Sequence, residues 1–476
     1  MFSGTQAPLF SFRPRLSPRT RLAGRIVAGL CAILVGAGSG RAHAQATQVR
    51  DLRALLDGDG WRDGLAAARR WAAQAPDDPE AVGLLGEALY RAGEIEEAET
   101  LLAPLAERGA AAARALLALG LIRNAQGREE EAGRLVDRAF EKDPADRIIA
   151  FRGSGAAATS ARAIELLQAY SGMSQGDDPD RARAAGESLR FLRALAGRRV
   201  WIPVSVPEKM EAPLRALGGG GSVRGYVVEV GLGEGKPVRM LLDTGSSGVF
   251  LLERIARRHG FTPLADSTTF GGGGDQRHDT SRGILPRFSL GSLAFREALV
   301  LTTAEEIEPT GQFHGVLGIQ CLEGYRITLD LARGRLLLDA PPENPAGQPY
   351  WEISGQLLSR AGAPSGRRGL FALDTGAARS VVSLAFVSEV PGASVGRTAA
   401  VRGYGGRLGG ARSVRGMILG FQGAQISADL ATDLALQSRL SGVEISGFLG
   451  LDLLSSARLV VDTRWRRVLL ETATRR

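Results

Sequence analysis

Cysteine and histidine are scarce in this sequence, which limits the kinds of site that it can build. The 476 residues include 2 cysteines and 4 histidines, and Cys31 lies within the first 44 residues. Loss of that segment would leave Cys321 alone, which would exclude an internal disulfide and leave stability to hydrophobic cores. The later histidines, His259, His278 and His314, have no partner at a metal-binding spacing. We therefore expect no metal site and no cofactor.

Signals for several other functions are also missing. The sequence has no Gly-x-Ser-x-Gly turn of a serine hydrolase, and its glycine runs lack the Lys-Ser/Thr pair of a phosphate-binding loop. The formal net charge is +8, but six arginines lie in the first 44 residues, and without them it falls to +2. No basic tract with interleaved aromatic residues occurs elsewhere, so we do not expect nucleic-acid binding.

The sequence also lacks a hydrophobic run long enough for a permanent membrane span. The run from Ile26 to Ala37 is clearly shorter than the roughly 20 residues that a spanning helix needs. It follows an arginine-rich start and precedes Ala42-His43-Ala44, a pattern typical of a secretory signal peptide over residues 1–44. We expect cleavage after Ala44 and a periplasmic or secreted protein, as in exported bacterial proteins. The alternative is an uncleaved membrane anchor.

Residues 45–198 have the composition and spacing of helices. They are rich in alanine, leucine, glutamate and arginine, with apolar residues three and four apart. Gly93 and Ala98 recur at one fixed offset as Gly127 and Ala132. This pattern resembles tetratricopeptide repeats, whose helix pairs stack on one another to bury their apolar faces. The resemblance implies an all-α domain that binds a protein partner or acts as a spacer; the alternative is a generic helical bundle.

The composition changes near Val200 to apolar strands separated by glycine-rich turns, which predicts an all-β half. Asp-Thr-Gly occurs there twice, beginning at Asp243 and at Asp374. Two later glycines that follow apolar residues, Gly318 and Gly450, are separated by the same interval to within one position. Chance turns would not keep one spacing, so this half contains an internal duplication.

The duplication sets the expected domain boundaries. Residues 199–222 form a linker or first strand, residues 223–347 form a first lobe, and residues 348–476 form a second lobe. Length is compatible with this plan, since 476 residues are enough for roughly three domains. We expect a multidomain protein with N-terminal helical repeats and a C-terminal bilobal all-β half.

The repeated order of apolar strand, Asp-Thr-Gly and later apolar-Gly resembles the aspartic peptidase superfamily, which includes two-lobed pepsins and dimeric retropepsins. The resemblance implies a bilobal double barrel of strands in which Asp243 and Asp374 meet as a catalytic pair. It also implies that Thr244 and Thr375 bond across to the opposite loop. Gly245 and Gly376 are expected to leave room for backbone amides beside the carboxylates. Ser246 resembles the pepsin version and would bond its aspartate. Ala377 resembles the retropepsin version.

Two carboxyl groups explain the chemistry. Peptide hydrolysis without a metal needs a base to activate water and an acid to protonate the leaving group. Like charges a few ångströms apart cannot both ionise, so one aspartate keeps its proton while the other stays charged. We therefore predict an aspartic endopeptidase that acts on peptides or unfolded proteins. The alternatives are a catalytically silent peptide-binding protein on the same fold and an assembly scaffold that works through its helical repeats.

Two glycine-rich stretches are candidates for flap hairpins over an extended peptide, one in each lobe; the alternative is plain turns. The candidate residues are Gly272, Gly273, Tyr404 and Gly405. Pepsins place a tyrosine in the flap of the first lobe, whereas Tyr404 lies in the second. Because both aspartates lie beyond residue 240, we also expect a fragment from about Val200 onward to be active without the repeats.

Overall fold

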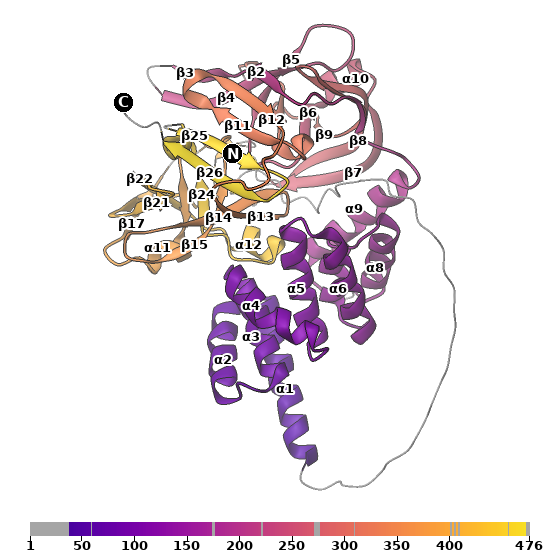
Figure 1. The fold of residues 1–476 in the computed structure, drawn as a ribbon, viewed down its shortest axis with the longest axis vertical. Coiled ribbons are helices and arrows are strands. Elements are labelled where there is room, and N and C mark those ends of the chain that lie inside the picture. The colour runs from indigo at the N-terminus through magenta and orange to yellow at the C-terminus, as the bar shows by residue number, and fades with distance from the viewer. Residues whose placement is uncertain are drawn as a thin grey trace.

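The computed structural model describes residues 38–58, 60–173, 177–219, 222–270, 277–308, 310–399, 402–403, 406–407, 410–455 and 457–472. Helices form the N-terminal part and strands dominate the C-terminal part, and the two parts pack against each other (Figure 1). The predicted order of an all-α part followed by an all-β part is therefore confirmed. The flap candidates Gly272, Gly273, Tyr404 and Gly405 lie outside the described residues, as does the apolar run of the predicted signal peptide.

The N-terminal part is a series of helices that pack on their neighbours in the sequence. These helices are α1 (Gly38–Asp57), α2 (Trp61–Gln74), α3 (Pro79–Arg91), α4 (Ile95–Glu107), α5 (Ala113–Ala125), α6 (Glu129–Lys142), α7 (Arg147–Ser154), α8 (Ser160–Met173) and α9 (Pro179–Leu195). The predicted repeat corresponds to the pairs α3–α4 and α5–α6. Gly93 and Gly127 form the turns within these pairs at φ values of 79° and 76°, where glycine is favoured. Ala98 and Ala132 are fully buried.

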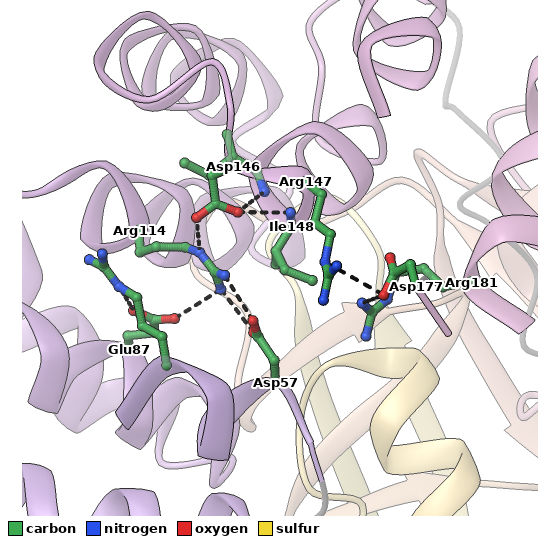
Figure 2. Close-up of polar contacts among 10 residues, drawn as sticks. Asp57, Glu87, Arg114, Asp146, Arg147, Ile148, Asp177 and Arg181 are labelled. Atoms are coloured by element: carbon green, nitrogen blue, oxygen red, sulfur yellow. Dashed lines mark hydrogen bonds and ion pairs between the residues drawn. The ribbon is translucent and has the colours of Figure 1, made fainter. Parts of the chain in front are cut away.

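A buried arginine connects several of these helices (Figure 2). Arg114 of α5 donates to Asp57 at 2.9 Å, to Glu87 at 3.2 Å, and to Asp146, which caps the start of α7. Burial alone would lower the pKa of Arg114, but the three carboxylates raise it. The guanidinium group therefore stays charged and joins α1, α3, α5 and α7 into one body.

The first lobe consists mainly of strands. They are β1 (Ile202–Ser205), β2 (Met210–Pro213), β3 (Arg215–Gly219), β4 (Ser222–Val230), β5 (Val238–Leu242), β6 (Val249–Leu252), β7 (Thr262–Phe270), β8 (Arg277–Leu290), β9 (Leu293–Thr303), β10 (Gly315–Leu317), β11 (Arg326–Asp330) and β12 (Arg335–Asp339). Short helices interrupt them at α10 (Glu253–Arg258), η1 (Ile319–Leu322) and η2 (Leu331–Arg333). The predicted linker, residues 199–222, contains β1 to β3, which pair with β9, β12 and β4.

The second lobe repeats this plan. Its strands are β13 (Gln348–Ile353), β14 (Gln356–Gly362), β15 (Arg368–Leu373), β16 (Val381–Ser383), β17 (Ser394–Thr398), β18 (Arg402–Gly403), β19 (Gly406–Arg407), β20 (Arg412–Arg415), β21 (Ile418–Phe421), β22 (Ala424–Ser427), β23 (Leu430–Thr432), β24 (Gly447–Leu449), β25 (Ala457–Asp462) and β26 (Arg467–Thr472). The helices α11 (Leu384–Ser388), α12 (Ala435–Ser441) and α13 (Leu451–Leu454) lie between them.

The internal duplication is visible in the strand pairing. In the first lobe β10 runs parallel to β5 and antiparallel to β6, and in the second lobe β24 has the same relation to β15 and β16. The lobes are joined by a sheet with the order β13-β26-β25-β11-β12-β2, in which β11 and β25 pair antiparallel. This continuous sheet fixes the lobes relative to each other.

Within the described ranges, every helix is too short or too polar for a membrane span.

Candidate active site

The two Asp-Thr-Gly loops begin at equivalent strand ends. Asp243 follows β5 and Asp374 follows β15, and each is held by the neighbouring strand that carries the apolar-Gly signal. The amide of Asp243 donates to the carbonyl of Leu317 at 3.0 Å, and the amide of Asp374 donates to that of Leu449 at 2.9 Å. The parallel pairing of these strands therefore determines where each aspartate emerges.

The two threonines bind the loops to each other. The amide of Thr244 donates to Oγ1 of Thr375 at 3.1 Å, and the amide of Thr375 donates to Oγ1 of Thr244 at the same distance. Each hydroxyl then donates to a carbonyl of the opposite lobe, Thr244 to Leu373 at 2.7 Å and Thr375 to Leu242 at 2.9 Å. All donors and acceptors of this fully buried set are satisfied in pairs, which makes the contact rigid.

The two glycines allow each loop to approach the aspartate of the other lobe. A Cβ atom built on Gly376 would lie 2.5 Å from Cγ of Asp243, and one built on Gly245 would lie 2.8 Å from Cγ of Asp374. Real Cβ atoms do not approach other atoms so closely, so glycine is required at both positions by close packing. The requirement comes from the opposite lobe and not from the loop's own conformation.

The carboxyl groups are buried beside each other. Asp243 is 0% exposed and Asp374 is 1% exposed. Oδ1 of Asp243 accepts the amide of Gly245 at 2.8 Å, whereas Oδ2 has no donor among the described residues. Burial raises the pKa of Asp243 well above its usual range, and the neighbouring carboxyl of Asp374 raises it further.

The residue after glycine makes the same main-chain bond in both loops. The amides of Ser246 and Ala377 donate to the main-chain carbonyls of Asp243 and Asp374, each at 3.2 Å. In the second lobe the amide of Ala377 also donates to Oδ1 of Asp374 at 2.9 Å. Within the described part of the chain, the Ser246 hydroxyl makes no bond to Asp243, so the bond implied by the pepsin resemblance is not found. The donor to Oδ1 of Asp243 is the amide of Gly245.

Sequence reasoning missed a set of supporting residues behind the loops. Oδ1 of Asp452 accepts the hydroxyl of Ser380 at 2.7 Å, and Oγ of Ser380 accepts the amide of Gly450 at 2.9 Å. In the first lobe Oε1 of Gln320 accepts the amide of Gly248 at 3.1 Å. Gln320 and Asp452 stand at the same position after the apolar-Gly signal of their lobes, so an alignment of the two lobes could have found them.

Gln320 also connects the lobes. Its Nε2 donates to the carbonyl of Gly355 at 2.6 Å, in the turn between β13 and β14. Gly355 has φ 74°, and a Cβ atom there would lie 2.3 Å from Cβ of Ser247. The first active-site loop is therefore packed against a turn of the second lobe.

Comparison with known families agrees with this geometry. Residues 210–321 match the family described as aspartyl protease. The chain carries an aspartyl protease domain. The match to the protease family includes the first Asp-Thr-Gly loop and the apolar-Gly strand beside it. Residues 61–122 match the tetratricopeptide repeat family, so the predicted repeats are confirmed as well.

Matches to individual proteins add little to these families. No curated protein matches the sequence. Solved structures that match include a double mutant of MamA (17% identity, 32% of this chain, 85% of that chain, TM-score 0.24) and MamA itself (14%, 34%, 84%, 0.23). A thermophilic TPR protein of Thermus thermophilus matches at 19% identity over 32% of this chain and 81% of that chain, with a TM-score of 0.25. At these TM-scores the likeness says nothing about function.

Proposed function

We propose that this protein is an aspartic endopeptidase that hydrolyses peptides or unfolded proteins with water activated between Asp243 and Asp374. One observation supports it most strongly. Two buried aspartates occupy equivalent positions in two loops that are locked together by the reciprocal bonds of Thr244 and Thr375. A binding protein would not need two carboxyl groups whose proximity opposes the ionisation of one of them.

The raised pKa of Asp243 supports one proton shared between the two carboxyls at the start of the reaction. In the mechanism that we propose, Asp243 holds this proton and Asp374 is the base. Asp374 takes a proton from water while the water oxygen attacks the scissile carbonyl carbon, and Asp243 gives its proton to the carbonyl oxygen. The tetrahedral intermediate then collapses: Asp243 takes a proton back from one of its hydroxyls as the C=O bond re-forms, the C–N bond breaks, and the amine leaves with the proton held by Asp374. The amide donors of Gly245 and Ala377 keep the carboxylates oriented throughout.

Replacement of either aspartate tests this proposal. Because both carboxyls are needed, Asp243→Asn and Asp374→Asn should each remove nearly all cleavage of a denatured protein, and the double variant should lose little more. Asp63→Asn, at an exposed position of α2, is the matched control and should retain full activity. Circular dichroism checks the fold of each variant. Cleavage at the wild-type rate by a folded single variant would contradict the mechanism, and no cleavage by wild type at any pH would favour the peptide-binding alternative.

We further propose that the protein is exported. The support is the arginine-rich start, the apolar run and the Ala42-His43-Ala44 sequence. The expected cleavage position, after Ala44, lies within α1, so the helix of the mature protein would begin at Gln45 or later. N-terminal sequencing of protein isolated from the native host should therefore begin at Gln45. Retention of Met1 would favour the membrane-anchor alternative.

A further inference from the structure

Strand β15, which leads into Asp374, is buried on both faces by different parts of the protein. Phe371 and Leu373 belong to the core that the two lobes share, whereas Leu370 and Ala372 belong to a core formed largely by the N-terminal helices. The alternation follows the two-residue period of a strand. None of these four side chains is more than 1% exposed. Helices therefore cover one face of the strand that positions the second aspartate.

The neighbouring strands share this arrangement. The same helical core includes Leu358 of β14, Val381 of β16 and Phe448 of β24. Strands β14 and β24 flank β15 in the sheet, β16 lies beyond β24, and β24 supplies the carbonyl that holds the amide of Asp374. The helical part thus covers the group of strands from which the second active-site loop emerges, and Figure 1 shows it lying against this lobe beside α12.

The first lobe covers the equivalent strand with its own chain. Leu241 of β5 belongs to a cluster with Phe250, Val316, Ile307 and Phe313. Ile307 and Phe313 come from the segment between β9 and β10. Among the described residues, this cluster contains no side chain from the helical part. The two lobes repeat one plan, but only the second uses the helical repeats as the outer layer of its active-site strand.

The contact between the helices and the second lobe is close and includes the main chain. A Cβ atom built on Gly93 would lie 3.1 Å from Cδ1 of Leu370 and 3.2 Å from the carbonyl oxygen of Glu444. The amide of Glu444 donates to the carbonyl of Arg91 at 2.9 Å. Its carboxylate accepts from Arg62 at 2.8 Å, and the Glu444 side chain is only 10% exposed. Such a contact cannot slide without breaking buried polar bonds.

Charged pairs at the edges of the contact fix its orientation. Arg360 of β14 donates to Glu96 at 2.7 Å and lies 3.1 Å from Glu94. At the other end of the helical part, Glu187 of α9 accepts the amide of Thr268 at 3.1 Å. Thr268 lies on β7, at the edge of its sheet, so the helices also bind the first lobe. The helical part therefore bridges both lobes.

We propose that helices α3 to α5 are a structural layer of the active site, which positions Asp374 against Asp243 through β15. This inference rests on the proposed function for its meaning in catalysis. It differs from the expectation, drawn from sequence, that a fragment from about Val200 would work alone. Without the helices, the apolar face that contains Leu370 and Ala372 would meet water, and the second loop would lose its outer support.

Two turn glycines of the repeats provide a matched test in the full-length chain. Gly93 and Gly109 have similar φ values, 79° and 73°, so a side chain strains the backbone equally at both. Only Gly93 touches the second lobe, since a Cβ atom on Gly109 would have no other atom within 4 Å. Gly93→Leu should therefore displace β15, whereas Gly109→Leu should add the backbone strain alone and leave the lobe in place.

The expected results separate positioning from general destabilisation. Gly93→Leu should lower kcat by about 10-fold or more, with a smaller change in KM, because small misplacement of a catalytic group is costly. The alkaline limit of its pH profile should move to lower pH, because carboxyls that lie farther apart repel each other less. Hydrogen exchange should become faster in residues 368–374 and 447–449 but not in residues 238–242. Gly109→Leu should match wild type in kcat, pH profile and exchange of these strands.

Several outcomes would overturn the inference. Wild-type kcat, pH profile and exchange in folded Gly93→Leu would show that the contact does not position Asp374, and identical losses in both variants would show a general effect of strain. If Gly93→Leu does not fold, Gly93→Ala and Gly109→Ala offer the same comparison with a smaller side chain. If wild type cleaves nothing, the proposed function fails, and the exchange comparison alone still decides whether the helices hold β15.

Discussion

Single residues at the centre of this site are constrained by the opposite lobe, and a mutation of Gly376 tests this constraint directly. A Cβ atom there would overlap the Asp243 carboxyl at 2.5 Å. Gly376→Ala should therefore separate the loops and lower kcat by about 100-fold. Gly172→Ala, in α8 and with no other atom within 4 Å of the new Cβ, is the control and should retain wild-type kcat. Steady-state kinetics with thermal unfolding of both variants checks this, and full activity in folded Gly376→Ala would contradict the close packing.

The sequence predicted the identity of these residues better than their contacts. The repeated triplets located Asp243 and Asp374, and their shared spacing implied a pair. The missing bond of Ser246 could not be predicted, because the direction of its hydroxyl depends on the folded loop, in which the amide of Gly245 is the donor to the Asp243 carboxyl. Likewise, the side-chain amide of Gln320 reaches a turn in the other lobe, which no local pattern encodes.

Secondary structure elements were predictable where their pattern is local. The fixed offset between Gly93 and Gly127 correctly indicated a helical repeat, and in the structure both glycines form turns with a positive φ that glycine tolerates. Strand β2 was harder to separate from a linker. It is short, Met210–Pro213, and is stabilised by pairing with β12, which lies at the far end of the first lobe. Short strands of this kind acquire their structure from distant partners.

Strand β15 shows the limit of prediction at this scale. Its sequence from Gly369 to Leu373 is almost continuously apolar, as expected for a strand that is covered on both faces. The apolar pattern predicts that both faces of the strand are buried, but it does not identify the residues that bury them. The covering helices and the strand are separated by the whole first lobe, since α5 ends at Ala125 and β15 begins at Arg368. Only the folded chain reveals that the two modules share one core.

The arrangement of the whole molecule follows from contacts between modules, which composition and periodicity cannot predict. The sequence indicated two lobes and a helical domain, and each is present. It did not indicate that the helices would cover the active-site strand of the second lobe but not that of the first, or that a continuous sheet would join the lobes. A consequence is that buried charges of the first lobe contribute to the stability of the whole joined body, with signs that depend on their surroundings.

Two buried aspartates should therefore change the pH dependence of global stability in opposite directions. Burial and the carboxyl of Asp374 raise the pKa of Asp243, so ionisation of Asp243 opposes folding. The folded protein is therefore fully stable with respect to this group below its unfolded pKa of about 4. This stability is lost as pH rises through the folded pKa. Asp243→Asn should thus unfold about 2 to 5 °C higher than wild type at pH 7, and the difference should vanish below about pH 4.

Asp330 is the matched control with the opposite sign. Burial raises the pKa of Asp330, but the bonds and charge of Arg333, together with Arg458, lower it further, so the net shift is downward. Its ionised form therefore contributes stability above the unfolded pKa, which is lost as pH falls through the folded pKa. Asp330→Asn should cost roughly 1 kcal/mol at pH 7, because its partners Arg333 and Arg458 are 68% and 41% exposed, and less in acid. Thermal unfolding of both variants across pH measures this, and shifts of the same sign at pH 7 would show that the Asp243 and Asp374 carboxyls are not electrostatically coupled in the folded protein.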